Sequence, residues 1–230
     1  MKKYLLKEYG SWSIMAIAFM TGLLVSKGAG VDAAWAFVAL ALLVNSKQAF
    51  TLWMRRVNGS GALLIFLAQA LVSATIFILL FGKGILDLLP LIIIPIMYIA
   101  LLVFKGEHFI LTEISGFAVL SLSAVISKFS VTANVDYILY LCVAVYFIAG
   151  VFKVRVRFKR STFMRAVMIV YVFFSFAACY LMKVPVIVLL PLADNLVFSI
   201  TMYKVKLMVT GWVEVTKGVL FLLLMMFFYG

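Results

Sequence analysis

Charged residues are scarce in this chain of 230 residues. They make up 12% of the sequence, whereas hydrophobic residues make up 67% and the mean hydropathy is +1.24. A water-soluble globule of this size needs far more polar surface than so few charges supply. The composition therefore excludes an ordinary soluble domain and predicts an integral membrane protein.

Histidine and cysteine are rarer still, with one His and two Cys. His108 stands in a polar turn with no partner at metal-ligand spacing. Cys142 and Cys179 lie inside apolar runs, where the expected role is packing as small hydrophobic side chains. A metal site built from His or Cys is not expected, and the sequence carries no nucleophile elbow, phosphate loop, haem-attachment or zinc signature.

Acidic residues are also few, so that the net charge is +12. In a soluble protein this excess would suggest nucleic acid or another polyanion as the partner. In a membrane protein, topology and anionic lipid headgroups account for most of it. We therefore expect membrane lipids as partners and no nucleic acid.

Long apolar runs fill most of the chain and predict an all-α fold in one domain, residues 1–230. Runs of about 20 apolar residues indicate membrane helices, because the strands of a barrel alternate over about ten residues. The first run continues past signal-peptide length without a cleavage pattern, so no cleavable signal peptide is expected. The nine expected spans are Gly10 to Ser26, Ala33 to Trp53, Leu63 to Phe81, Leu88 to Phe104, Phe109 to Ile126, Tyr137 to Val151, Phe163 to Met182, a run that begins at Lys183 and Pro185, and Gly211 to Phe228.

Two features qualify these spans. Pro90 and Pro95 are expected to bend the fourth. The eighth and ninth are the least apolar, because they contain Asp194, Glu214 and Lys217.

The distribution of Lys and Arg predicts the orientation of the chain, since short cytoplasmic loops keep positive charge. With nine spans, fifteen basic residues fall on the face that holds the N-terminus. The other face receives only Lys27, Lys83, Lys128 and Lys183. We expect a multi-pass protein of a prokaryotic inner membrane, the cell membrane, with the N-terminus in the cytoplasm and the C-terminus outside.

The densest basic segment is Gly150 to Arg165, which carries six Lys and Arg residues and no Asp or Glu. So many charges between two apolar segments predict a polar turn. Basic residues of this kind most simply set topology and contact lipid headgroups. A sharper hypothesis is that several of them bind an anionic phosphate or diphosphate headgroup; the candidates are Arg55, Arg56, Lys153, Arg155 and Arg157.

Three acidic residues lie inside expected spans. An ionisable group there costs about 2.5 to 3.5 kcal/mol on insertion scales, so Glu113 is expected to face the bundle interior or a wet cavity, as a ligand-binding or proton-handling carboxylate or as a structural partner of a Lys. Asp194 invites the same alternatives, and Pro191 adds another, because the acid could satisfy carbonyls that a bend frees. Glu214 stands three residues before Lys217, which favours an ion pair within one helix.

Four short segments, taken in order, resemble the YwiC-like family of membrane proteins, a divergent branch near the UbiA-type intramembrane prenyltransferases. The first is Lys7-Glu8-Tyr9-Gly10-Ser11-Trp12, close to the family's Lys-Glu/Gln-His-Gly-Ala-Trp; the others are Leu111 to Gly116, the basic segment, and Thr210 to Glu214. Lys7, Glu8 and Trp12 match the family motif, whereas Tyr9 replaces its His, which puts proton transfer at that position in doubt.

This resemblance implies a nine-helix, UbiA-like bundle around a membrane cavity that opens to the cytoplasm, with functional turns after the second and sixth helices. In the prenyltransferases, Asp-rich motifs at those turns hold Mg²⁺, which binds the prenyl diphosphate. Here the corresponding segments, Leu43 to Gly61 and Gly150 to Arg165, contain no carboxylate. The sequence therefore does not support Mg²⁺ as a cofactor, and whether the protein is a prenyltransferase-like enzyme stays open.

Three hypotheses for the function remain at this point. The protein binds an isoprenoid or another lipid with an anionic headgroup at the basic turns; or it is a non-catalytic structural or quinone-contacting subunit of a larger membrane complex; or it is a small-solute or proton-coupled transporter that uses Glu113 and Asp194.

Overall fold

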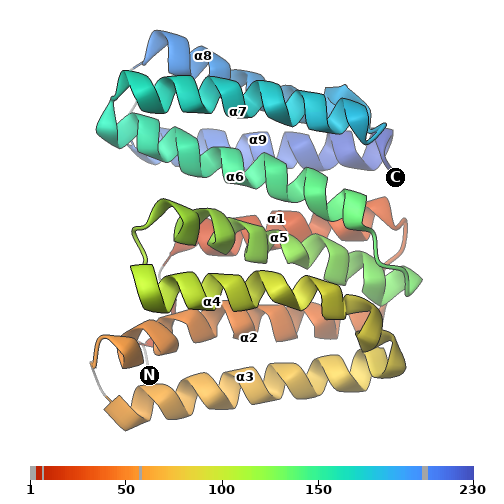
Figure 1. Cartoon of the computed structure of the whole chain (residues 1–230). Helices are drawn as coiled ribbons and strands as arrows, with labels where there is room; N and C mark the ends of the chain where they lie inside the picture. The colour runs from red at the N-terminus through yellow and green to blue at the C-terminus, as the bar shows by residue number, and fades with distance from the viewer. Residues whose placement is uncertain (1–3, 7, 57–58, 204–206) are drawn as a thin grey trace.

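The computed structural model describes residues 4–6, 8–56, 59–203 and 207–230, and these residues form helices joined by short turns, with no strand among them (Figure 1). The elements in chain order are α1 (Tyr9–Val25), α2 (Val31–Met54), α3 (Gly59–Phe81), the 3-10 segment η2 (Gly82–Ile92), α4 (Ile93–Lys105), α5 (Ile110–Thr132), α6 (Tyr137–Lys159), α7 (Thr162–Leu181), the 3-10 segment η3 (Val186–Leu192), α8 (Ala193–Thr201) and α9 (Leu207–Phe228). The expected all-α membrane architecture is confirmed.

Seven of the described helical segments are long and apolar enough to cross a membrane. Two shorter apolar segments, Tyr9–Val25 and Val186–Thr201, correspond to the first and eighth expected spans. At 1.5 Å per residue, the 17 residues of α1 reach about 25 Å, less than the roughly 30 Å of a hydrocarbon core. A multi-pass membrane protein is therefore supported, while nine full crossings remain a prediction.

The helices preceding α4 and α8 are 3-10 segments that contain proline. Pro90 lies in η2 and Pro191 in η3. Proline has no N–H and its ring crowds the preceding turn, so it is poorly suited to the interior of an α-helix. Pro95 lies in the first turn of α4, where its missing N–H costs little. The fourth span thus begins at the Gly82 turn as a 3-10 helix, earlier than the sequence predicts.

The prediction of a long polar turn at Gly150 to Arg165 is wrong. Helix α6 continues to Lys159, and only Arg160 and Ser161 separate it from α7. Lys153, Arg155 and Arg157 therefore project from the last turns of a helix. This placement is tolerated because Lys153 and Arg155 both have acidic partners on other helices.

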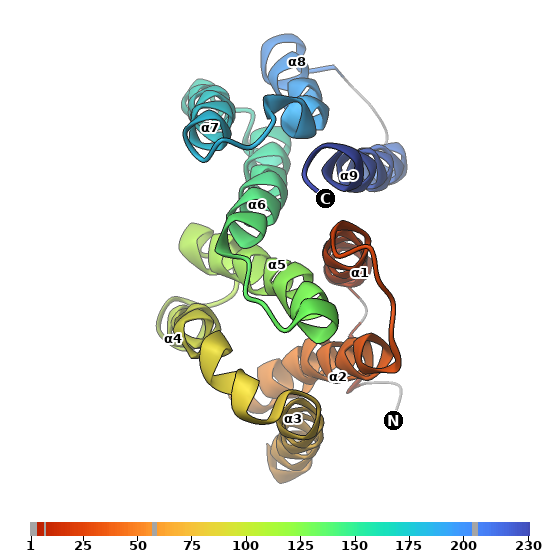
Figure 2. The same ribbon diagram turned by 90° about the vertical axis from the view of Figure 1, so that its right-hand side faces the viewer.

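The helices run roughly along one direction, so that their turns gather at two ends (Figure 1). One end holds the start of α1 and the turns α2–α3, α4–α5 and α6–α7, and we call it the basic end. The C-terminus lies at the opposite end. Viewed along the helices, α1, α5 and α6 occupy the middle, α2, α3 and α4 lie on one side, and α7, α8 and α9 lie on the other (Figure 2).

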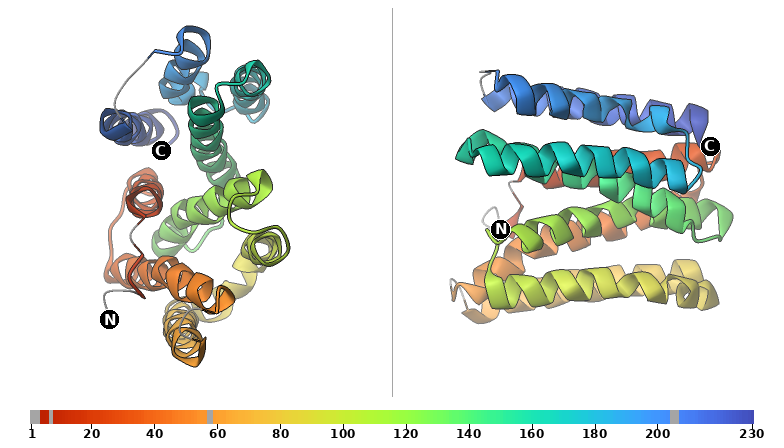
Figure 3. Two further views of the ribbon diagram at one scale, coloured as in Figure 1. Left: turned by 90° about the vertical axis from the view of Figure 1, so that its left-hand side faces the viewer. Right: turned by 45° about the horizontal axis from the view of Figure 1, so that its top comes forward.

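A core of buried residues lies where the middle helices α1, α5 and α6 meet α7, η3 and α9. Helix α9 packs beside α1, and α5 packs against both α1 and α6 (Figure 3). Tyr146 of α6 stacks on Phe221 of α9 with a centroid distance of 4.0 Å and an interplanar angle of 5°. Small side chains such as Ala18 and Ala124 are fully buried in the same cluster, which lets α1 and α5 approach closely.

Candidate functional site

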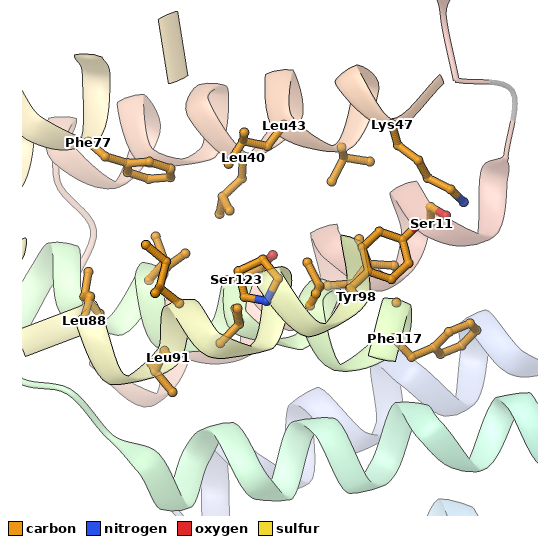
Figure 4. A pocket seen from close by; sticks show the side chains of 18 of the residues that line it. Ser11, Leu40, Leu43, Lys47, Phe77, Leu88, Leu91, Tyr98, Phe117 and Ser123 are labelled. Atoms are coloured by element: carbon orange, nitrogen blue, oxygen red, sulfur yellow. The ribbon is translucent and has the colours of Figure 1, made fainter. Parts of the chain in front are cut away.

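A cavity of about 630 Å³ lies between the start of α1 and α2, α3, η2, α4 and α5. Side chains converge on it from different elements, as Leu40, Phe77 and Tyr98 show (Figure 4). Most of its surface is apolar, and the apolar part is lined by residues that include Phe77, Phe81, Leu88, Leu91 and Ile126. The cavity is therefore mostly apolar and lies inside a bundle of membrane helices.

The charged residues of the cavity and His108 lie toward the basic end, and we call this part of the cavity the mouth. Glu8 precedes α1, and Glu107 and His108 form the turn between α4 and α5. Lys47 comes from the last turns of α2, and Glu113 from the first turn of α5. An apolar interior with a polar mouth is the arrangement that suits an amphipathic ligand.

Each of the three carboxylates at the mouth has a basic partner. Lys47 Nζ lies 2.6 Å from Glu8 Oε2, and Arg55 Nη2 lies 2.8 Å from Glu107 Oε2. Arg155 Nε lies 2.8 Å from Glu113 Oε2, and its Nη2 donates to the carbonyl of His108. These three pairs balance in charge, so the mouth is polar without a net charge from them.

Glu8 is held ionised by its surroundings. Half-burial alone would raise its pKa, but the hydrogen bond and positive charge of Lys47 outweigh this and lower the pKa below its ordinary value. Ser11 Oγ also donates to Glu8 at 2.9 Å. The pair with Lys47 ties the start of α1 to α2 beside the cavity.

A second group of charges lies between α6, α8 and α9, and consists of Lys153, Asp194, Glu214 and Lys217; we call it the buried charge cluster. Lys153 is only 3% exposed and its ammonium contacts both Asp194 and Glu214. Lys217 Nζ lies 3.1 Å from the nearest oxygen of each acid and 2.6 Å from Asn195 Oδ1. The pair that the sequence predicts between Glu214 and Lys217 is present, but within a network across three helices.

The structure separates the five basic residues proposed for an anionic headgroup. Arg55 pairs with Glu107 and Arg155 with Glu113, both carboxylates of the mouth. Lys153 belongs to the buried charge cluster. Arg157 donates to Thr210 Oγ1, and Arg56 is exposed. None of the five lines the cavity. They do not form one anion site, because two contact the mouth and two lie against α8 or α9.

The three intramembrane acids also fall into two places. Glu113 lines the cavity and pairs with Arg155, whereas Asp194 and Glu214 meet in the buried charge cluster. Asp194 also accepts a hydrogen bond of 2.9 Å from the hydroxyl of Tyr203. Its interactions are with side chains, so the bend at Pro191 is not needed to explain it.

The family-motif residues fix the chain where it enters α1. Lys7 lies outside the described residues. Glu8 pairs with Lys47, as above, and Trp12 Nε1 donates to the carbonyl of Leu6 at 3.1 Å. The N–H of Leu6 in turn donates to Asn45 Oδ1 at 3.0 Å. Glu8 and Trp12 thus position the N-terminal segment over the side of the mouth.

The geometry does not fit the Mg²⁺ that the prenyltransferase resemblance implies. Among the described residues, no three His, Cys, Asp or Glu side chains are grouped so that they could hold a metal ion. Of the three acids inside expected spans, Asp194 and Glu214 come together, and they share Lys153 and Lys217 as partners. The negative charges of Asp194 and Glu214 are therefore already balanced by two lysines.

Tyr98 and Thr112 are polar residues of the cavity that the sequence did not indicate as site residues. Nothing in the sequence marks Tyr98 of α4 as a cavity residue, because one Tyr in an apolar run is an ordinary interfacial or packing residue. Thr112 lies in the segment Leu111 to Gly116, but as a neutral residue beside Glu113 it carried no argument. Gly116 faces Tyr98 so closely that a Cβ there would lie 3.2 Å from its ring.

Comparison of the chain with protein-family models, with characterised proteins and with solved structures finds no match. The resemblance to the YwiC-like family and the UbiA-type prenyltransferases therefore stays a prediction from the sequence motifs, and the function must be argued from the cavity and its mouth.

Proposed function

We propose that this chain is a multi-pass membrane protein that binds an isoprenoid or another long-chain lipid, with the chain of the lipid in the cavity and its headgroup at the mouth. The observation that carries the proposal is the 630 Å³ cavity, which is apolar along most of its length and polar at the basic end. Its volume lies within the roughly 300–1,000 Å³ of typical ligand pockets.

The physical source of affinity differs from that of a soluble lipid carrier. A lipid that arrives from the bilayer gains little from the hydrophobic effect, because it leaves one apolar environment for another. Binding must then come from close packing along the chain and from hydrogen bonds to the headgroup. The aromatic rings of Phe77 and Phe81 and the polar groups of the mouth supply these two terms.

The proposal includes the orientation of the protein. The start of α1 and the turns α2–α3, α4–α5 and α6–α7, all expected in the cytoplasm, lie at the basic end, and we place this end at the cytoplasmic side of a cell membrane. The mouth of the cavity then faces the cytoplasm. Nine crossings would require α1 and the η3–α8 segment to span despite their short lengths.

A transporter that uses Glu113 and Asp194 together finds less support. Glu113 is at the mouth of the cavity, while Asp194 is held by Lys153 and Lys217 on the other side of α6. The two acids have different partners and belong to different clusters. No common site links them.

A bulky side chain at Gly116, where the apolar interior of the cavity meets the polar mouth, tests the proposal. Gly116→Leu places a side chain against Tyr98 and into the cavity, whereas Gly211→Leu is a matched control on α9, where a Cβ meets nothing within 4 Å. We expect lipid that copurifies with the protein, measured by mass spectrometry after gentle detergent extraction, to fall at least tenfold for Gly116→Leu and to stay constant for Gly211→Leu. Equal lipid content in a folded Gly116→Leu protein and in the unmodified protein would reject the proposal.

A further inference from the structure

We propose, resting on the proposed function, that the lipid bound in the cavity has an uncharged headgroup with a carbonyl or hydroxyl oxygen, which accepts hydrogen bonds from Tyr98 and Thr112. This assigns a chemical class to the ligand and two recognition residues to the mouth. It also departs from the anionic headgroup that the basic residues suggest from sequence alone.

The hydroxyl groups of Thr112 and Tyr98 both belong to residues that line the cavity, and neither has a hydrogen-bond partner among the described residues. Thr112 is 2% exposed, lines the cavity, and its Oγ1 makes no hydrogen bond within the described part of the chain. Tyr98 also lines the cavity, and none of the hydrogen bonds found among the described residues involves its hydroxyl. A buried hydroxyl such as that of Thr112 is normally paired, whereas Tyr98 is half-buried. An acceptor supplied by a ligand would give both hydroxyl groups a partner.

The positions of Tyr98 and Thr112 suit contact with a headgroup. Tyr98 lies across the cavity from α2, on the side of Ser11 and Lys47 (Figure 4). Its ring covers Gly116, one turn along α5 from Thr112. The two hydroxyl groups therefore lie where the apolar interior of the cavity meets the charged mouth. A headgroup whose chain fills the interior would reach this level.

The charges at the mouth disfavour an anionic headgroup. The carboxylates of Glu8, Glu107 and Glu113 all line the mouth, and the cation nearest to each is already paired with it. A diphosphate would have to displace a carboxylate from its Lys or Arg and would then lie beside that displaced acid. Like charges at short range repel strongly where the surroundings are poor in water. An uncharged acceptor meets no such barrier and leaves the three ion pairs intact.

The test compares three probes on the whole protein in lipid nanodiscs: farnesol, a decyl-substituted benzoquinone, and farnesyl diphosphate. We expect at least one uncharged probe to bind tenfold or more tightly than the diphosphate. Comparing farnesol with the quinone then tells whether a hydroxyl or a carbonyl is preferred. Tighter binding of farnesyl diphosphate would overturn the inference.

Hydroxyl deletions make the test specific to the two residues. Tyr98→Phe and Thr112→Val keep the side-chain shapes, and each is expected to weaken the preferred uncharged probe about five- to tenfold, the usual effect of one hydrogen bond. Tyr180→Phe is the control, since Tyr180 is 74% exposed on α7 and does not line the cavity. Unchanged affinity in both folded variants would also overturn the inference.

The outcomes separate this inference from the proposed function. If farnesyl diphosphate binds best and Gly116→Leu abolishes its binding, the cavity is a lipid site and only the uncharged headgroup is wrong. If none of the three probes binds, or if Gly116→Leu binds all of them normally, the proposed function fails together with the inference.

Discussion

Gly22 of α1 packs directly against the backbone of Ala124 of α5. A Cβ at residue 22 would overlap the carbonyl oxygen of Ala124 and lie 2.8 Å from its carbonyl carbon. Both residues are fully or almost fully buried at the centre of the bundle, between the cavity side and the side of the buried charge cluster. Their contact therefore sets how closely α1 and α5 approach each other.

The first prediction is that Gly22→Ala destabilises the protein by about 1–3 kcal/mol, because the added methyl forces α1 away from α5. Unfolding in mixed dodecyl maltoside and SDS micelles measures the effect. Gly10→Ala is the control in the same helix, since a Cβ there meets nothing within 4 Å. Equal stability of the two variants would mean that the α1–α5 interface tolerates extra volume.

The second prediction concerns Lys153. Replacement by Met leaves Asp194 and Glu214 with Lys217 as their remaining lysine, and two acids then share one cation. The expected loss is about 2 kcal/mol or more, between the ~0–1 kcal/mol of an exposed pair and the ~3–5 kcal/mol of a fully buried one, because both acids are partly exposed. The thermal unfolding temperature in detergent measures it.

A matched variant and a double variant complete this test. Lys159→Met removes an exposed lysine from the end of the same helix and is expected to change stability little. Adding Glu214→Gln to Lys153→Met removes the excess negative charge and is expected to restore part of the loss. If Lys153→Met and Lys159→Met behave alike, the buried charge cluster does not hold α6, α8 and α9 together.

The sequence predicts the helices better than the polar contacts between them. Apolar runs predict membrane helices because each such run must satisfy its own backbone hydrogen bonds in lipid. The pair Glu214–Lys217 was also predictable, since residues three apart share a helix face. The role of Lys153 was not, because its burial depends on acids that lie 41 and 61 residues away in sequence.

The same limitation applies to the candidate site. The cavity is lined by residues from six elements, so no single periodic pattern in the sequence marks it. Charge density at Gly150 to Arg165 indicated a turn, but interhelical carboxylates allow the helix to continue through it to Lys159. A basic cluster predicts an anion site only if its residues are free of acidic partners, and for Arg55, Lys153 and Arg155 that depends on tertiary structure.

The third prediction is a pH dependence at Asp136, which precedes α6 at the end opposite the mouth. Half-burial opposes ionisation, but the N–H of Leu139, the ammonium of Lys128 and the hydroxyl of Tyr229 outweigh it and lower the pKa of Asp136 below its ordinary value near 3.8. A lowered pKa in the folded state stabilises the protein above pH ~4, and this contribution is lost as the pH falls through the folded value.

Asp136→Asn tests this sign. The amide still accepts from the N–H of Leu139 but lacks the charge that pairs with Lys128. We expect the variant to be about 1 kcal/mol less stable at pH 7, and the difference to shrink as the pH falls below the ordinary pKa of 3.8 and through the lower folded-state pKa. Thermal unfolding from pH 7 to about pH 2 measures it. A difference that does not change with pH would show that Asp136 acts through shape alone.

The fourth prediction concerns the orientation of the protein, using the two ends of α6. Its 23 residues extend about 35 Å, longer than the roughly 30 Å of a hydrocarbon core. Lys159 at one end and Asn134 just before the other are exposed, so cysteines placed there should lie on opposite sides of the membrane. The native Cys142 and Cys179 are fully buried and serve as an unreactive background.

Since positive charge stays in the cytoplasm, a membrane-impermeant maleimide added to right-side-out vesicles is expected to label Asn134→Cys and to leave Lys159→Cys unlabelled. Detergent should make both react, which controls for local burial. The reversed pattern would place the mouth outside the cell, and any lipid headgroup at Tyr98 and Thr112 would then be offered to the outer face. Labelling of both variants in intact vesicles would mean that α6 does not cross the membrane as a single span.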